Sequence, residues 1–226
     1  HLEHRRQRQM CIRDRYSDLP FYILKEYIER HHNKLFKDLV QNNLYQSLGA
    51  NLTTFLPLEK FSLNMIPPTE IDQYFRMQKI HGFVHDQGAA LLGGVSGHAG
   101  LFSNSNDIAK IMQMYLWNGS YGNKQYIKSE TIDLFNSCNF CNEDVRRGVG
   151  FDKPQLEDLG PTCGCISMNS FGHSGFTGTF TWADPDEEII YVFLSNRTYP
   201  SAENKSIIEN NLRSDIQGLI YESIEN

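Results

Sequence analysis

A glycine-punctuated segment near the carboxyl end, residues 172–185, most constrains how this chain can fold. Its sequence is GHSGFTGTFTWADP, and its first seven residues carry one ionisable side chain, His173. Glycine permits the close approach of a backbone to another group, and β-branched and aromatic residues favour an extended strand. The segment therefore predicts a strand whose backbone lies against a bound molecule, with His173 beside it.

The order of the other elements predicts helices first and sheet later. Apolar spacing and capping residues predict helices over residues 19–32, 34–45, 105–118, 129–135 and 202–225. The expected N-cap residues are Asp18, Ser105 and Ser129. Residues 170–183 and 188–195 predict two strands joined as a hairpin. The closing helix is expected to lie on this sheet through a stripe of Ile208, Leu212, Ile216, Leu219 and Ile220.

Four stretches, in this order, resemble the motifs of a known family. Residues 16–18 resemble a Y-x-N loop, residues 84–103 the glycine-rich segment before the next long helix, and residues 147–154 the edge that precedes a K-[ST]-G strand. Residues 173–175 resemble that strand, with His173 in the place of Lys. The family is the penicillin-recognising serine hydrolases, which include β-lactamases, DD-peptidases and related esterases. Within it, the chain is most similar to the β-lactamase-type domains that some bacteria join to a glycoside hydrolase.

The resemblance implies an α/β (α+β) fold of the β-lactamase/transpeptidase type, in which helices flank an antiparallel sheet and an α lobe is inserted. It covers about residues 16–226, with mainly the α lobe over residues 16–150 and the sheet strands and closing helix over residues 151–226. The family's first strands and its nucleophile helix are expected to be missing.

The first fifteen residues, HLEHRRQRQMCIRDR, contain five Arg and show no periodic apolar face. They resemble the translation of a sequencing adapter, which predicts a non-native arm over residues 1–15; a natural basic arm is the alternative. Without them, Lys plus Arg falls from 21 to 16 and Asp plus Glu from 27 to 25, so the formal charge moves from -6 to -9. This acidic balance argues against a nucleic-acid partner, whose phosphates require clustered cations.

The family's nucleophile lies in an S-x-x-K motif upstream of the tyrosine loop. No serine in this sequence has Lys three positions later. Covalent catalysis needs its nucleophile, so the chain as given is predicted to be inactive although its family is hydrolytic. The alternatives are a non-catalytic binding domain of the same fold and a hydrolase with Ser174 as nucleophile. The second fails the G-x-S-x-G pattern, because Phe176 stands at the fifth position.

The resemblance assigns catalytic roles to Tyr16, Asp18 and His173. Tyr16 would move protons between the serine and the leaving group. Asp18 stands where Asn is usual, and because Asp cannot donate an amide N–H, helix capping is an equal alternative. An imidazole is only partly charged at neutral pH, so His173 would hold a substrate carboxylate less firmly than Lys, which makes neutral esters or amides accessible. A packed core histidine is its alternative.

Ser174, Gly175 and Phe176 are the expected substrate-binding and oxyanion residues. By the resemblance, Ser174 hydrogen-bonds the substrate, Gly175 permits its close approach, and the Phe176 N–H is one oxyanion donor. His85 and His98 flank the glycine-rich segment and are expected to serve packing rather than catalysis.

The remaining predictions concern cysteines, partners and location. Cys138 and Cys141, and Cys163 and Cys165, form closely spaced pairs for which disulfides or unpaired thiols are favoured over a zinc knot, because the second pair is shorter than the usual zinc spacing. No metal or cofactor is expected. The implied substrate is a small molecule or a peptidoglycan-derived peptide, and the implied partner is a fused glycoside hydrolase domain. The resemblance places the protein in the periplasm or cell envelope of a bacterium.

Overall fold

The computed structural model describes residues 16–139, 141, 146–155 and 160–224, so the predicted arm over residues 1–15 lies outside the described residues. The helices of four or more residues are α2 (Leu19–His32), α3 (Phe36–Val40), α4 (Gln87–Leu91), α5 (Ser105–Leu116), α6 (Ser129–Asn136), α7 (Ser206–Glu209), α8 (Leu212–Glu222) and the π-helix η1 (Gln41–Tyr45). Two 3-10 turns follow η1, at η2 (Pro57–Glu59) and η3 (Leu63–Met65). The strands are β1 (Pro68–Asp72), β2 (Gln78–His81), β3 (Ser120–Tyr121), β4 (Lys124–Gln125), β5 (Phe171–Ser174), β6 (Phe180–Asp184) and β7 (Ile189–Phe193).

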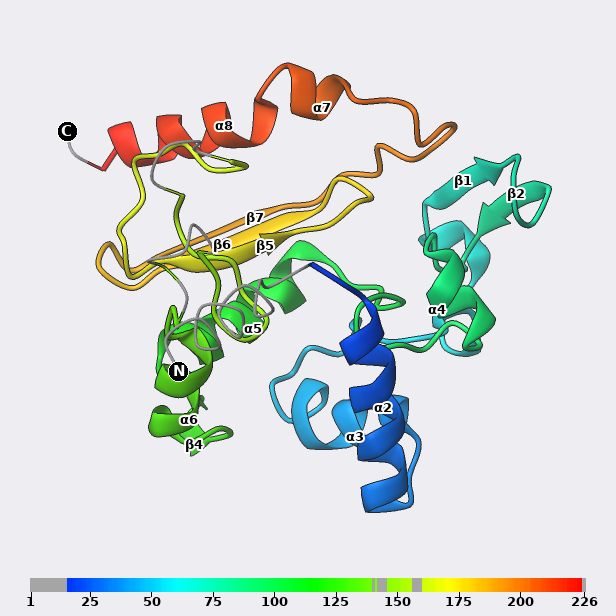
Figure 1. Cartoon of the computed structure of the whole chain (residues 1–226), viewed down its shortest axis with the longest axis horizontal. Coiled ribbons are helices and arrows are strands. Elements are labelled where there is room, and N and C mark those ends of the chain that lie inside the picture. Colours follow the sequence, from blue (N-terminus) through cyan, green and yellow to red (C-terminus); the bar gives the residue numbers. More distant parts are fainter. Residues whose placement is uncertain (1–15, 140, 142–145, 156–159, 225–226) are drawn as a thin grey trace, which may run out of the picture.

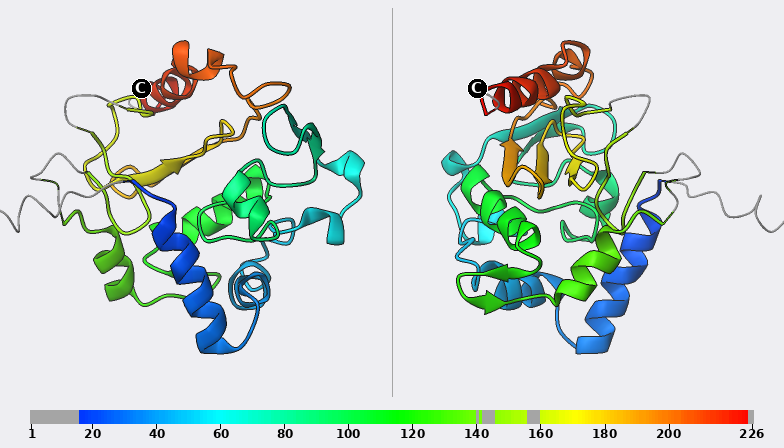
Figure 2. Two further views of the ribbon diagram at one scale, coloured as in Figure 1. Left: turned by 45° about the vertical axis from the view of Figure 1, so that its right-hand side comes forward. Right: turned by 90° about the vertical axis from the view of Figure 1, so that its left-hand side faces the viewer.

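An antiparallel sheet in the order β5-β6-β7 lies between α5 on one face and α8 on the other (Figures 1 and 2). Successive residues of each strand point to opposite faces of the sheet, so the core around it is divided into two clusters. Phe171 and Ala183 pack with Met112 of α5. The opposite cluster is formed by Phe180, Trp182 and Tyr191, with Ile220 of α8 packed against it. This helix–sheet–helix arrangement confirms the predicted α/β fold class.

The pairing of β5 with β6 depends on a glycine. Gly172 lies opposite Trp182, and a Cβ at Gly172 would come 2.4 Å from the Trp182 ring and 2.2 Å from the Thr181 carbonyl oxygen. The fully buried Trp182 also donates from Nε1 to Ser170 Oγ at 2.9 Å. Only a residue without a side chain leaves room for this indole, so the glycine fixes the register that sets His173 opposite Thr181.

A buried carboxylate ties α8 to the sheet. Asp184 is fully buried and accepts hydrogen bonds from Ser167 N at 2.8 Å and from Tyr221 Oη at 2.8 Å. Burial by itself raises the pKa of Asp184, but the bonds from Ser167 and Tyr221 outweigh it and hold that pKa below its usual value. Burial and the neighbouring Asp184 raise the pKa of Tyr221. The pair therefore remains a carboxylate with a phenol donor.

The glycine-rich segment packs directly on the first turn of α2. A Cβ at Gly97 would lie 2.8 Å from the Phe21 carbonyl oxygen, and one at Gly88 would lie 2.2 Å from Tyr22 Oη. Glycine at these positions therefore brings the segment against the helix that follows Tyr16.

The β1–β2 hairpin, which the sequence did not predict, lies beside α4 (Figure 1). Its strand pattern is hidden because β1 buries two acids, Glu70 and Asp72, both paired with Arg76. Thr198 Oγ1 donates to the Thr69 carbonyl at 2.8 Å, which connects the hairpin to the chain that follows β7.

Two predicted elements are divided in the structure. Residues 170–183 form β5 and β6 rather than one strand, because Gly175 N donates to the Thr179 carbonyl at 2.7 Å and closes a turn between them. The closing helix is broken at Asn211, whose φ of 51° is left-handed. Its expected apolar stripe was mostly wrong: α8 buries Gln217 and Tyr221, whereas Ile208, Leu212, Ile216 and Leu219 are exposed.

The predicted helix caps were also wrong in detail. The Asp18 side chain makes no capping hydrogen bond, and Leu19 N donates to Ser17 Oγ instead at 3.3 Å. Asn104 rather than Ser105 caps α5, with its side chain accepting from Asp107 N, and Ser129 is the first residue of α6 rather than its cap. The N-cap positions of α5 and α6 are therefore Asn104 and Lys128, one residue before the predicted caps.

The cysteine pairs are joined as Cys138–Cys141 and Cys163–Cys165 disulfides, so their sulfurs are not free thiolates for a zinc knot. Among the described residues, no helix combines the length and apolar character needed to cross a membrane.

Two glycine substitutions should have opposite effects on stability. Gly172→Ala should destabilise the protein by about 1–3 kcal/mol or more, because the new methyl group meets backbone and indole. Gly218→Ala should stabilise it by about 0.5–1 kcal/mol, because Gly218 is inside α8 and the nearest atom to its new Cβ, in Cys163, is 3.7 Å away. Urea unfolding measures both; equal effects would contradict the packing described for β5 and β6.

Candidate functional site

The structure brings Tyr16 and His173 together from segments far apart in the sequence. Tyr16 precedes α2, His173 is in β5, and their ring centroids are 6.4 Å apart. Arg147 lies over the Tyr16 ring, with its Cζ 4.7 Å from the ring centroid, and pairs with Asp152. Asp152 Oδ2 lies 3.9 Å from His173 Nε2. A phenol, a guanidinium, a carboxylate and an imidazole thus meet at the edge of the sheet.

The backbone orients the His173 ring. Its Nδ1 is 2.7 Å from the Ser174 carbonyl oxygen, and because a carbonyl only accepts, Nδ1 carries the proton. Nε2 is then the ring nitrogen that faces Asp152 and can exchange a proton. Ser174 therefore orients His173 through its backbone, while its own backbone pairs with Phe180 in the sheet.

The turn after β5 is shaped by close contacts. A Cβ at Gly175 would lie 2.2 Å from Thr179 Oγ1, and one at Gly178 would lie 2.4 Å from Ser195 Oγ. Gly178 N donates to the Gly175 carbonyl at 2.9 Å. The turn presents Phe176 at its tip, with 63% of that residue exposed.

Arg197 fixes this turn through hydrogen bonds to its backbone carbonyls. It is 8% exposed, its Nε donates to the Phe176 carbonyl at 2.7 Å, and its backbone N donates to the Thr177 carbonyl at 2.9 Å. Its Nη1 donates to the carbonyls of Ala202 and Asn204, at 2.7 and 2.9 Å. The guanidinium also lies 4.3 Å from the centroid of the Phe176 ring. One buried cation therefore determines the position of the Phe176 backbone.

His85, in the segment just before α4, contacts the ring of the same phenylalanine, Phe176. Its ring stacks on Phe176 at a centroid distance of 5.0 Å. Its Nδ1 lies 3.0 Å from Glu70 Oε1, without the alignment of a hydrogen bond, and Arg76 donates to Glu70 Oε1 at 2.9 Å. His85 thus packs against the candidate site, in line with the packing role expected from the sequence, and contributes an aromatic face to it.

Asp18 lies in a different set of side chains, with Asp86 and His98. The ligand atoms of these three residues all lie within 4.8 Å of one another, a distance compatible with a metal ion. However, both His98 nitrogens are already engaged, Nδ1 with Ser96 Oγ at 2.9 Å and Nε2 with Asp86 Oδ1 at 2.9 Å. Asp86 also caps α4 by accepting from Ala89 N at 2.7 Å. The set is therefore a hydrogen-bonded packing network, in which His98 contacts the side chains of Ser96 and Asp86.

The electrostatics of this network favour a charged Asp86 and a neutral Tyr22. Burial opposes ionisation of Asp86, but the Ala89 N–H and the His98 ring lower its pKa below the ordinary value. Burial, Asp86 and Asp18 together raise the pKa of Tyr22, whose ring meets His98 edge-on at 4.8 Å. Tyr22, in the first turn of α2, therefore keeps its phenolic proton.

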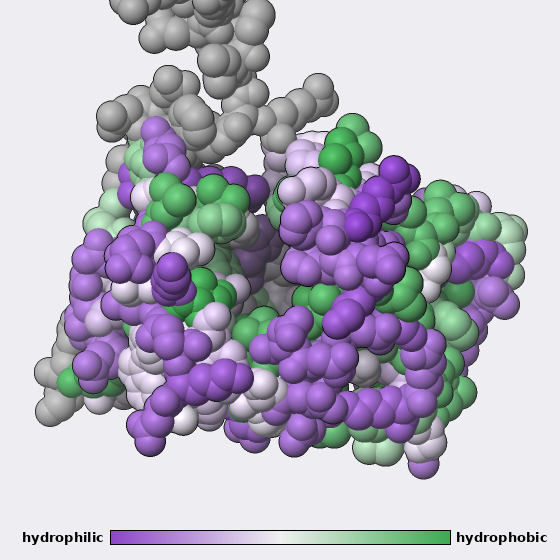
Figure 3. Space-filling view, turned by 90° about the horizontal axis from the view of Figure 1, so that it is seen from below, coloured by the Kyte–Doolittle hydropathy of each residue, from purple (hydrophilic) through white to green (hydrophobic). Residues whose placement is uncertain are grey.

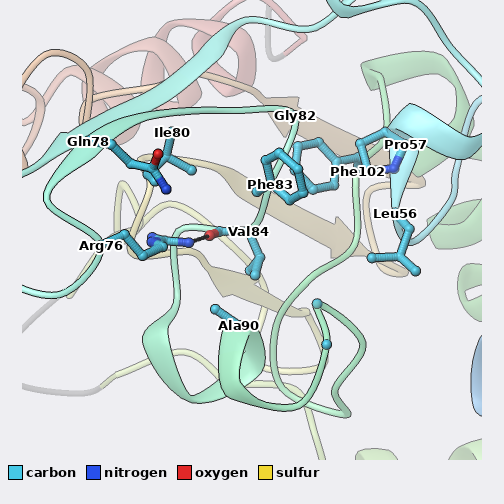
Figure 4. A pocket seen from close by; sticks show the side chains of 12 residues that line it. Leu56, Pro57, Arg76, Gln78, Ile80, Gly82, Phe83, Val84, Ala90 and Phe102 are labelled. Carbon is cyan, nitrogen blue, oxygen red and sulfur yellow. Dashed lines mark hydrogen bonds between the residues drawn. The ribbon is translucent and has the colours of Figure 1, made fainter.

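A cavity of about 330 Å³ lies between the β1–β2 hairpin, α4 and the chain before η2 (Figure 4). Arg76 forms part of the cavity wall, where it donates a hydrogen bond to the Val84 carbonyl. None of the six predicted site residues lines it. Figure 3 shows another feature, a hollow between the part of the surface that carries α6 and the part that carries α2, on a mostly hydrophilic face.

Three members of the site, Arg147, Asp152 and Arg197, were not predicted from the sequence. Arg147 and Asp152 are within the stretch used for the resemblance, but an exposed charge pair is the ordinary interpretation of such residues. Arg197 carried no signal, because only the fold shows that this arginine is buried.

Comparisons with known proteins give a consistent result. The family model described as Beta-lactamase matches residues 4–213. A protein of Escherichia coli K12 named "Putative D-alanyl-D-alanine carboxypeptidase" is 36% identical over 197 residues, 81% of this chain and 45% of that protein. A protein of Salmonella agona with the same name is 36% identical over 86% of this chain and 48% of its own length. The chain thus spans about half the length of these curated relatives.

Solved structures share the fold at low identity. A beta-lactamase of Mycobacterium bovis matches with a TM-score of 0.57 and 18% identity, covering 88% of this chain and 65% of that one. A penicillin binding protein of Bacillus halodurans matches with a TM-score of 0.59 and 12% identity, over 89% and 57% of the two chains. Simvastatin synthase of Aspergillus terreus matches with a TM-score of 0.60 and 15% identity, over 88% and 53%.

Arg197→Met should loosen the turn after β5. The change leaves the carbonyls of Phe176, Ala202 and Asn204 without their charged donor, at a cost of about 2–4 kcal/mol. Urea unfolding measures this cost, and amide hydrogen exchange should show faster exchange at Gly178 N. Arg30→Met, at a position with 79% of its side chain exposed, is the matched control and should change neither measurement. Unchanged exchange at Gly178 would show that Arg197 does not hold the turn.

Proposed function

Since the chain belongs to the beta-lactamase family, we propose that the protein containing it is a serine hydrolase that acts through an acyl-enzyme on an amide, ester or β-lactam. The relatives named as D-alanyl-D-alanine carboxypeptidases support a peptidoglycan-related substrate, that is, a peptide ending in D-alanine. The observation that carries the proposal is the meeting of Tyr16 with His173 at the edge of β5, beside the turn that presents Phe176.

In this proposal each group has a distinct role. A serine hydroxyl attacks the substrate carbonyl, and its proton passes through Tyr16 to the leaving group as the carbonyl–leaving-group bond breaks. The Phe176 N–H donates to the oxygen that becomes negative in the tetrahedral intermediate, and Gly175 leaves room for that oxygen to approach. Water then attacks the acyl-enzyme and restores the serine. His173 and Ser174 bind the far end of the substrate.

Asp18 has a supporting role in the proposal. Its backbone carbonyl accepts from Phe21 N at 3.0 Å and begins α2, directly after Tyr16. Its carboxylate lies within 4.8 Å of the ligand atoms of Asp86 and His98. Asp18 would therefore hold the tyrosine loop in place, and a direct proton transfer by Asp18 is not part of the proposal.

The proposal includes the organisation and location of the protein. Residues 16–150 would form mainly the α lobe, and residues 151–226 the catalytic sheet edge and closing helix. The carboxypeptidase and penicillin-binding names among its relatives support a place in the bacterial cell envelope. The likeness to glycoside-hydrolase-linked domains supports a fused partner domain. No cofactor takes part.

A second candidate is a non-catalytic binding domain of the same fold. The observation that favours it is that none of the serines in the 226 residues has Lys three positions later. An S-x-x-K motif upstream of Tyr16 in the full gene would support the hydrolase, and its absence would support the binding domain.

Covalent probes distinguish these two functions. The 226-residue chain should form no adduct with a fluorescent penicillin or a fluorophosphonate, since its sequence holds no S-x-x-K serine. The full-length protein should be labelled once, at the serine of its S-x-x-K motif. Ser174→Ala should leave that label intact. Stoichiometric labelling at Ser174 would refute the assignment of roles, and an unlabelled full-length protein would favour the binding domain.

Substitutions at His173 test its role in binding a substrate carboxylate. An imidazole offers full charge only on the acid side of neutrality, whereas Lys is always charged. In the full-length protein, His173→Lys should raise kcat/KM for an anionic substrate relative to a matched neutral ester, by roughly tenfold at pH 8. His173→Ala should lower that ratio at pH 6. If the three proteins share one ratio at both pH values, His173 does not recognise the carboxylate.

A further inference from the structure

The peptide N–H of Phe176 is a donor without a partner at the tip of the turn after β5. Within this turn, Gly175 N donates to the Thr179 carbonyl at 2.7 Å and Gly178 N donates to the Gly175 carbonyl at 2.9 Å. In the part of the chain that the structure describes, no group accepts a hydrogen bond from the Phe176 N–H. Such an N–H can donate to a bound molecule as long as its peptide plane keeps one direction.

The Phe176 side chain is fixed by two planar groups. The residue is 63% exposed, so it is not held by a surrounding core. The His85 imidazole stacks on its ring, with 5.0 Å between the centroids and 14° between the planes. The Arg197 guanidinium lies 4.3 Å from the centroid of the same ring. A ring held in this way keeps one side-chain rotamer, and the rotamer restricts the backbone angles of the same residue.

His85 is itself held by a buried ion network. Arg76 Nη2 donates to the His85 carbonyl at 2.9 Å, and Arg76 Nη1 donates to the neighbouring Val84 carbonyl at 2.6 Å (Figure 4). Arg76 also donates to Glu70 Oε1, the oxygen that lies 3.0 Å from His85 Nδ1. The Arg76 and Glu70 side chains are only 14% and 10% exposed. Buried charges of this kind must keep their partners, so the imidazole rests on a rigid support.

The two groups that hold Phe176 are connected to each other through β1. Glu70, which faces His85, belongs to this strand. Thr198, the residue after Arg197, is fully buried, and its Oγ1 donates to the carbonyl of Thr69 in the same strand at 2.8 Å. The hairpin therefore supports the Phe176 ring directly, through His85, and also borders the segment that carries Arg197.

From these contacts we infer that His85 is a positioning residue for the proposed hydrolysis, whose stacked ring holds Phe176 so that the Phe176 N–H points at the carbonyl oxygen of the substrate. The inference rests on the proposed function. His85 acts through Phe176 and transfers no proton, so its flat ring matters more than its nitrogens. A fixed donor acts mainly on the charge of the transition state, and its loss therefore lowers kcat more than it changes KM.

Substitutions at His85 separate stacking from the chemistry of the imidazole. In the full-length protein, His85→Ala should lower kcat for p-nitrophenyl acetate roughly tenfold, a part of the roughly 10²- to 10³-fold that loss of a whole oxyanion donor costs. KM should change less than twofold. Acylation and deacylation both pass through an oxyanion, so kcat reports the effect whichever step is slower. His85→Phe, which keeps a flat ring, should recover most of the lost kcat.

His31 provides the matched control. Its ring stacks on Tyr27 of α2, with 5.8 Å between the centroids and 19° between the planes. His31→Ala thus removes the same imidazole from another stacked pair and should leave kcat unchanged. An equal loss of kcat in His31→Ala, or equal losses in His85→Ala and His85→Phe, would contradict positioning by the His85 ring. A kcat for His85→Ala within twofold of the wild type would overturn the inference.

A measurement without turnover separates this inference from the proposed function. In full-length protein with ¹⁵N-labelled phenylalanine, the order parameter of the Phe176 amide should be about 0.85 in the wild type and fall below about 0.6 in His85→Ala. If the wild type hydrolyses no ester, the proposed function is wrong, while this fall would still support the placement of Phe176 by His85. An order parameter that stays at the wild-type value in His85→Ala would reject the inference even for an active enzyme.

Discussion

The need to satisfy two buried charges determines how the two ends of the sheet are built. Asp184, at the end of β6, is fully buried and accepts from Ser167 and Tyr221, which joins α8 to the strands. Arg197, after β7, donates to carbonyls on both sides and closes the turn between β5 and β6. An unpaired buried charge costs several kcal/mol, so each group requires its partners to stay in place. The site lies at the end that Arg197 holds.

The candidate site is assembled from backbone features more than from reactive side chains. The ladder from Arg147 through Asp152 to Gly172 aligns three segments at one edge, and the Ser174 carbonyl selects the protonated nitrogen of His173. Glycine at position 175 lets the chain turn immediately afterwards. A rigid backbone of this kind suits a reaction whose charge develops on a carbonyl oxygen, because fixed N–H groups need no reorganisation.

Charge at this edge is distributed over several groups. Arg147 and His173 lie on either side of Asp152, in a chain whose formal charge is -6. A local positive group in an acidic protein attracts anions to one place rather than to the whole surface. The second network, of Asp18, Asp86 and His98, is acidic and supports the first turn of α2. The two networks meet at the Tyr16–Asp18 loop.

The sequence by itself determined the span of α2, the β6–β7 hairpin and the family motifs, and it singled out Tyr16 and His173 as candidates, because periodicity and glycine chemistry are local properties. It could not determine which side chains meet. Whether Asp18 caps a helix depends on its backbone angles, and whether α8 buries Ile216 or Tyr221 depends on Asp184. Arg147 and Arg197 have the same chemistry in the sequence. Only the tertiary structure leaves the first half-buried over Tyr16 and buries the second behind Phe176, because burial and pairing are decided by segments far apart in the chain.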